Sequence, residues 1–92
     1  MSERLIENHL KKRMTAAGGL CWKLTSPSTA GVPDRICVFP GGEVVFVELK
    51  APGKTPNPMQ ERRIKALRAC GATAGWLDSK GAVDKFVDAR LA

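Results

Sequence analysis

The stretch from residue 31 to residue 50 constrains the fold more than any other part of the chain, because its pattern predicts a β-hairpin that ends in charged residues. Two apolar strands are expected at 35–39 and 43–49, on either side of a Pro-Gly-Gly turn. Since side chains alternate between the two faces of a strand, Glu48 and Lys50 point the same way. The hairpin therefore carries an acid and a lysine together to one face at the end of an apolar strand.

Asp34 directly precedes the first of these strands, and the hairpin brings it alongside Glu48. Two neighbouring carboxylates repel each other unless a cation lies between them, and oxygen ligands suit a hard divalent ion. A Mg²⁺ or Mn²⁺ ion held by Asp34 and Glu48 would polarise a phosphodiester and lower the pKa of a bound water molecule. Lys50 would orient that water or stabilise charge on the phosphate.

The spacing of these residues resembles the PD-(D/E)xK nuclease signature. The chain has Pro-Asp at 33–34 and, after thirteen further residues, Glu-Leu-Lys at 48–50. The flanks, Gly-Val-Pro-Asp-Arg at 31–35 and Phe-Val-Glu-Leu-Lys-Ala-Pro-Gly at 46–53 followed by Gln60, resemble the VRR-NUC branch of that superfamily. The resemblance covers nearly the whole chain and implies a metal-dependent endonuclease.

The remaining sequence predicts one α/β domain over residues 1–92. Helices are expected at 3–17, at 58–70 and from residue 80 to 91, and strands at 20–25, 35–39, 43–49 and 72–77. The element order αβββαβα gives a mixed central sheet flanked by helices. This order agrees with the restriction-endonuclease-like core that the resemblance implies.

Glu7 lies at the rim of the apolar stripe of the first helix, where an acid needs an explanation. Residue chemistry alone favours a surface pair with Lys11, one turn further along. The resemblance instead places a metal-binding acid in this helix, and Glu7 matches its position. Glu3 is the competing candidate. We expect the full metal-binding set to be Asp34, Glu48 and Glu7, with the backbone carbonyl of Leu49 as a further ligand.

Gln60 stands at the start of the second helix and also has two interpretations. Asn57, three residues earlier, would form a capping box with it, which requires no active site. The resemblance places a glutamine here beside the catalytic lysine, so Gln60 is expected to support Lys50.

The charge balance predicts a polyanionic partner. Fifteen Lys and Arg residues face nine Asp and Glu, which gives a formal net charge of +6 and a pI near 9.7. The candidate contacts to DNA are Lys23, Ser26, Lys54 and Arg62. Aromatic residues are few, and the strand pattern predicts that most of them are buried, so recognition should depend on phosphates and duplex shape rather than base stacking.

Three cysteines, Cys21, Cys37 and Cys70, are far apart and are expected to be reduced core residues. A single histidine, His9, excludes an imidazole-based nuclease site. The sequence has no long apolar run and no signal-peptide pattern, which predicts a cytoplasmic or nucleoid-associated protein with no membrane role and no small-molecule cofactor.

The expected activity is Mg²⁺- or Mn²⁺-dependent hydrolysis of DNA. Because one small domain cuts one strand at a time, and stand-alone members that resemble this chain are junction-resolvase-like dimers, we expect a homodimer selective for branched, Holliday-junction-like DNA. The alternative is a non-catalytic nucleic-acid-binding module that has retained the fold. A third possibility, a protein-interaction adaptor, explains the charge poorly and the hairpin acids not at all.

Overall fold

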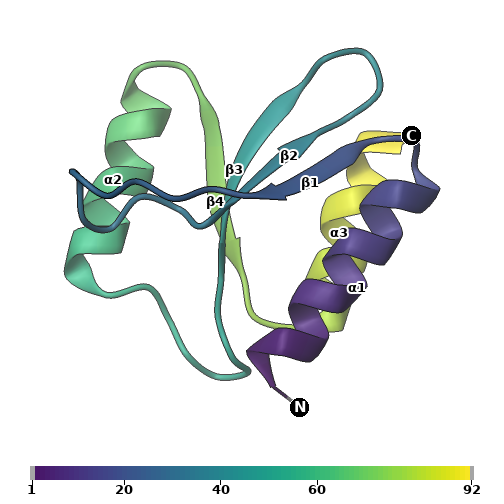
Figure 1. Ribbon diagram of the computed structural model, residues 1–92, viewed down its shortest axis with the longest axis horizontal. Helices are drawn as coiled ribbons and strands as arrows, with labels where there is room; N and C mark the ends of the chain where they lie inside the picture. The colour runs from purple at the N-terminus through teal and green to yellow at the C-terminus, as the bar shows by residue number, and fades with distance from the viewer. Residues whose placement is uncertain (1, 92) are drawn as a thin grey trace.

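The computed structural model describes residues 2–91, which form three helices and a four-stranded sheet (Figure 1). The elements are α1 (Glu3–Ala16), β1 (Leu20–Lys23), β2 (Arg35–Val38), β3 (Val44–Leu49), α2 (Pro58–Ala69), β4 (Thr73–Leu77) and α3 (Lys80–Leu91). The predicted order and type of every element are confirmed. Predicted and observed ends differ by no more than about two residues, the usual uncertainty at element ends.

The sheet has the strand order β1-β2-β3-β4. β1 and β2 are antiparallel, as are β2 and β3, whereas β3 and β4 run parallel because α2 forms the crossover between them. The sheet is therefore mixed, and the α/β fold with a mixed central sheet is confirmed.

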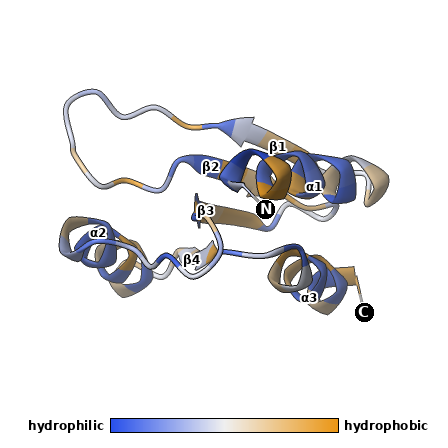
Figure 2. Cartoon of the chain, turned by 90° about the horizontal axis from the view of Figure 1, so that it is seen from below, coloured by the Kyte–Doolittle hydropathy of each residue, from blue (hydrophilic) through white to orange (hydrophobic). Residues whose placement is uncertain are grey.

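One face of the sheet, here called the covered face, packs against α1 and α3 (Figure 2). Every second residue of each strand points to this face, because successive side chains of a strand point to opposite sides of the sheet. The core consists of apolar side chains from β2, β3, α1 and α3, together with one from the turn after β2: Cys37, Phe39, Val45, Val47, Leu49, Ile6, Leu10, Met14, Val83 and Val87. Each fully buried aliphatic side chain of this kind contributes about 1.5–3 kcal/mol relative to exposure.

The other face is only partly covered, because α2 lies mainly over β4 and buries Ile64 there. Six apolar side chains from the remaining strands line the uncovered part, here called the open face: Leu20, Trp22, Ile36, Val38, Val44 and Phe46. Trp22 is 60% exposed and Leu20 is 46% exposed. The prediction that the strand pattern buries most aromatic residues is wrong for Trp22 and for Trp76, which is 39% exposed, because no helix covers these positions fully.

The loop between β1 and β2 is held against α2. Gly31 has φ +83°, and a Cβ added there would lie 2.7 Å from Cγ of Met59, so glycine is required for this close approach. Arg63 Nε donates a hydrogen bond to the Ala30 carbonyl at 2.8 Å. These contacts hold the backbone that leads into Asp34.

Polar side chains join α1 to α3 at the surface of the covered side. Asp84 accepts from Arg13 Nη1 at 2.7 Å, and its Oδ1 lies 2.7 Å from His9 Nε2. Arg13 also pairs with Asp88. His9 therefore takes part in a contact between helices, and these pairs hold α1 against α3.

The three cysteines are free thiols, as predicted. Cys37 is buried and Cys21 is half-buried, but Cys70 is exposed, so the core prediction is wrong for Cys70, which stands just past the end of α2. Within residues 2–91 there is no helix with the length and apolar character needed to cross a membrane.

Candidate active site

Asp34 and Glu48 are brought level with each other by the pairing of β2 and β3. Arg35, the first residue of β2, pairs with Val47 in the antiparallel register, so Asp34, just before β2, lies opposite Glu48 of β3. Glu48 is only 5% exposed, whereas the Asp34 side chain is 31% exposed. The Leu49 backbone N–H donates to Asp34 Oδ1 at 3.2 Å, which fixes the orientation of the carboxylate.

The environment of both acids disfavours their charged forms. Burial raises the pKa of Glu48 above its ordinary value, and the nearby charge of Asp34 raises it further. Burial also raises the pKa of Asp34, although the hydrogen bond from Leu49 and the charge of Lys50 act in the opposite direction. Two neighbouring carboxylates that repel each other suit a divalent cation, which would stabilise both in ionised form.

Lys50 and Gln60 both approach the same oxygen of Glu48. Lys50 Nζ lies 3.4 Å from Glu48 Oε2, and Gln60 Nε2 donates to that oxygen at 3.4 Å. The Lys50 backbone N–H donates to the Leu77 carbonyl at 2.9 Å, so the residue remains tied to β4 after the end of β3. The lysine, the glutamine and the acid thus form one connected group.

Gln60 forms the predicted capping box, and its side chain also contacts Glu48. Its backbone N–H donates to Asn57 Oδ1 at 2.8 Å, and its Oε1 accepts from the Asn57 backbone N–H at 2.9 Å, which completes a capping box. Because the cap uses the carbonyl oxygen of the side-chain amide, the NH₂ group remains free to face Glu48. The helix cap thereby orients a side-chain donor toward Glu48.

Glu7 is held by a residue that the sequence analysis did not single out. Its Oε2 pairs with Arg35 Nη2, while the predicted pair with Lys11 is looser, with 3.8 Å between Lys11 Nζ and Glu7 Oε1. Arg35 is 4% exposed and donates through Nη1 to the Asp34 carbonyl at 2.8 Å. The sequence did contain a sign of this role. Arg35 and Cys37 are two residues apart in β2 and point to the same face, so the strand pattern places an arginine among the apolar residues of the covered face.

Glu3, the competing helix acid, is also close enough to act on the site. Its negative charge contributes to the raised pKa of Asp34 and of Glu48. Across the part of the chain that the structure describes, no three His, Cys, Asp or Glu side chains form a ready-made metal cluster. The structure brings Asp34 and Glu48 together directly, and it connects Glu7 to them through Arg35.

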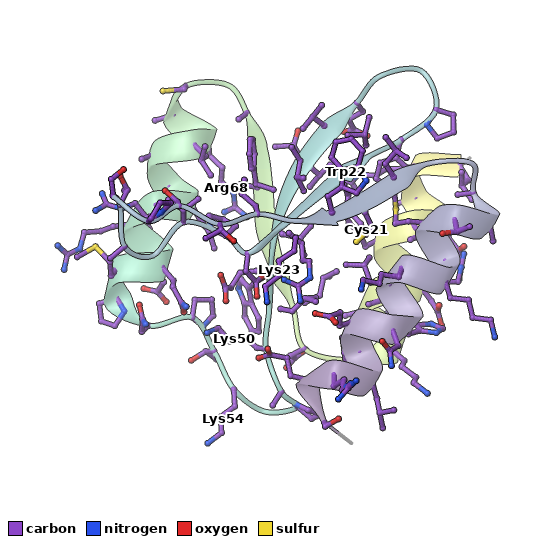
Figure 3. All side chains as sticks on the ribbon, in the orientation of Figure 1. Cys21, Trp22, Lys23, Lys50, Lys54 and Arg68 are labelled. Atoms are coloured by element: carbon purple, nitrogen blue, oxygen red, sulfur yellow. The ribbon has the colours of Figure 1, made fainter. Side chains whose placement is uncertain are left out.

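The predicted DNA contacts lie on four different segments of the chain. Lys23 is exposed at the end of β1, where it pairs with Arg35 in the register. Ser26 is half-buried in the loop that follows, and Arg62 is exposed on α2. Figure 3 shows Lys54, also exposed, beyond Lys50 on the segment that leaves β3.

The chain is similar to known proteins over most of its length. No family model matches it. A protein of Acyrthosiphon pisum secondary endosymbiont phage 1 that bears the name "Putative nuclease p44" is 44% identical over 78 residues, which cover 85% of this chain and 84% of the phage protein. A solved structure described as "VRR_NUC domain" superposes with a TM-score of 0.86 at 33% identity and covers 94% of each chain.

Proposed function

The chain belongs to the VRR-NUC family of PD-(D/E)xK nucleases, and on that premise we propose that it is a metal-dependent endonuclease that hydrolyses phosphodiester bonds of DNA. The observation that best supports this proposal is the group formed by Asp34, Glu48, Lys50 and Gln60. A buried and a half-buried acid with raised pKa values, an ammonium and an amide are the groups that metal-assisted hydrolysis needs.

Mg²⁺ or Mn²⁺ is the cation that this donor set fits. Asp34 and Glu48 would hold it, and the Leu49 carbonyl, on the residue whose N–H already binds Asp34, is the candidate for a further oxygen ligand. Glu7 was predicted as a third ligand, and its present partner is Arg35. When bound, such a cation polarises the phosphodiester and lowers the pKa of a water molecule.

The remaining residues orient the reacting groups. Lys50 would orient the attacking water, since its ammonium lies beside Glu48 and its side chain is 17% exposed. Gln60 would hold Glu48 from the other side, and its own rotamer is fixed by the cap of α2. This arrangement keeps the carboxylate in place while substrate binds.

DNA would be held by charge. The net charge of +6 favours the phosphate backbone. Lys23 on β1, Lys54 in the loop after β3 and Arg62 on α2 are exposed cations that would contact it. Ser26 would donate its hydroxyl to a phosphate from the loop that precedes Asp34. Binding of this kind weakens steeply as salt concentration rises.

A homodimer is the form in which this chain would act on branched DNA. The open face carries Leu20, Trp22 and Val44 with 46%, 60% and 39% exposure, a grouping of apolar side chains typical of an interaction surface. A second copy packed on this face would bury them and would supply a second active site for the second strand. Junction-like DNA, which requires two cuts, is therefore the proposed substrate.

The proposal is tested by incubating the purified protein with labelled four-way-junction, splayed and linear DNA in Mg²⁺, Mn²⁺ or EDTA. Asp34→Asn and Lys50→Ala are compared with Lys12→Ala, which removes an exposed lysine on the outer side of α1. We expect metal-dependent cutting that both active-site variants lose by at least about a thousandfold, since each removes several kcal/mol of charge stabilisation.

The Lys12→Ala variant should cut like the unchanged protein. The ranking of the three DNA substrates would show whether branched DNA is preferred. DNA binding without any metal-dependent cutting would instead favour the non-catalytic binding module.

A further inference from the structure

We propose that Arg35 is a positioning residue through which Glu7 acts on the metal-binding acids. This inference rests on the proposed function, because it concerns how the same site is organised. It assigns a role to an arginine that lies inside the protein and not in the group that would contact the cation.

The contacts of Arg35 connect two parts of the site that the sheet separates. Its register partner is Val47, whose side chain is in the core, so the Arg35 side chain also enters the covered face. Glu48 follows Val47 and therefore points to the opposite face. The guanidinium reaches Glu7 on α1 through Nη2, while Nη1 binds the Asp34 carbonyl at 2.8 Å and lies 3.5 Å from Asp34 Oδ2.

A structural role alone does not account for this arginine. The other inward positions of the same stretch are Cys37 and Phe39, both apolar and buried. Arg35 is 4% exposed, and its Nε is buried without a hydrogen-bond partner among residues 2–91, so its charge is costly at this position. An apolar side chain would fill the space at lower cost, which indicates that the charge is retained for the acids around it.

The shape of the guanidinium matters as much as its charge. A planar fork can bind two partners in fixed directions, whereas a lysine ammonium is a single point of charge. Arg35 uses the two ends of its fork for Glu7 and Asp34. Loss of the fork should therefore release the Asp34 backbone from α1 and loosen the geometry of the carboxylate pair.

Glu7 could act on the site in two ways, through Arg35 or as a direct ligand of the cation. If Glu7 acts only by holding Arg35, then its removal should matter only while Arg35 is present. If Glu7 is instead a direct ligand of the cation, its removal should weaken metal binding whether or not Arg35 is present. A double-mutant cycle separates these two cases.

The experiment measures Mn²⁺ affinity from the electron paramagnetic resonance signal of free Mn²⁺, without DNA. The proteins compared are the unchanged chain, Glu7→Gln, Arg35→Met and the double variant. We expect each single variant to weaken Mn²⁺ binding by about 10–100-fold, the usual effect of removing a residue that orients a ligand. The double variant should bind Mn²⁺ within about twofold of Arg35→Met.

Two further variants exclude a purely structural explanation. Arg13→Met removes an arginine that joins α1 to α3 away from the site, and it should lower the melting temperature without changing Mn²⁺ affinity. Arg35→Lys keeps the buried charge, so it tests the fork even where Arg35→Met folds poorly, and it should restore only part of the affinity. In cleavage assays, Arg35→Lys should lower kcat more than it changes KM.

Independent losses from Glu7→Gln and Arg35→Met, which multiply in the double variant, would overturn the inference and make Glu7 a direct ligand. Equal Mn²⁺ affinity for all variants would overturn it as well, while the proposed metal site would stand. Failure of the unchanged protein to bind Mn²⁺ at all would remove the proposed function itself, a result distinct from the other two.

Discussion

The covered face and the open face of the sheet are built from alternate residues of the same strands, yet they serve different purposes. On the covered face, Val45, Val47 and Leu49 are fully packed against helices. On the opposite side of β3, Glu48 is buried beside a second acid and Val44 is 39% exposed. One strand therefore supplies both the core and the candidate active site, because its side chains alternate.

The two faces contribute to the free energy of folding with opposite signs. The covered face buries apolar surface and gains free energy from it. The other face holds two carboxylates whose pKa values are raised by burial, so their charged forms oppose folding at neutral pH. Arg35 is the exception on the covered face, a charge placed among apolar side chains that also contacts the acids.

The largest effect on stability should come from the covered face. Leu10 is fully buried in α1, so Leu10→Ala should lower the free energy of unfolding by about 2–5 kcal/mol, measured by urea denaturation. Leu5, on the same helix, is 48% exposed, and Leu5→Ala should change it by less than about 0.5 kcal/mol. Similar losses from both variants would mean that α1 does not pack on the sheet as described.

Substitutions on the open face should have a smaller effect. They should weaken the association of two copies of the chain and leave the free energy of unfolding of each copy unchanged. Trp22→Ser should weaken the proposed dimer by at least about tenfold, since exposed tryptophans often contribute about 2 kcal/mol or more to interfaces. Analytical ultracentrifugation would measure this change. The control is Leu91→Ser on α3, an apolar residue of 51% exposure that lies away from the open face. A monomeric unchanged protein would contradict the dimer.

Removal of the Glu48 charge should stabilise the fold. The raised pKa means that the stability contributed by Glu48 is fully present below its ordinary pKa and is lost as pH rises through the folded-state pKa. Glu48→Gln should therefore raise the melting temperature at pH 7 without metal, and the gain should shrink as pH falls toward about 4.

In Mn²⁺ the unchanged protein should be more stable than Glu48→Gln. A bound cation stabilises the unchanged protein, while the variant lacks the carboxylate that would bind it. Differential scanning calorimetry from pH 4 to pH 8, in EDTA and in Mn²⁺, would measure both effects. A Glu48→Gln variant that is less stable than the unchanged protein in EDTA would show that the contacts of Glu48 with Lys50 and Gln60 outweigh its burial.

The smallest effect should come from the surface contact between α1 and α3. Hydrogen bonds from His9 and then from Arg13 lower the pKa of Asp84, so its contribution to stability is present above its ordinary pKa and is lost as pH falls through the folded-state pKa. Asp84→Asn should lower the melting temperature slightly at pH 7 and not at all near pH 2. High salt should reduce the difference. A loss that persists at pH 2 would show that charge is not its cause.

Much of this architecture could be predicted from residue order. The period of the apolar residues located every helix and strand, and glycines and prolines marked their ends. The spacing of Asp34 and Glu48 in a hairpin was enough to place them together. Such features are local or depend on one tight turn, which is why a single sequence contains them.

Other features depended on which element covers which position. The alternation in β1 predicted a half-buried strand, but it could not show that Cys21 contacts the core while Leu20 and Trp22 remain exposed. Exposure is decided by the helices that pack on each face. The same limit applied to Arg35, whose partners come from α1 and from the residue before it.

The sequence by itself determined the element order, the fold class and the pairing of the two central acids, because periodicity and turn residues act over short distances. Only the tertiary structure decided that Gln60 serves a helix cap and Glu48 at once, that Glu7 binds Arg35, and that two tryptophans remain exposed. Those outcomes depend on the packing of three helices against a twisted sheet, where residues far apart in the chain meet and compete for the same partners.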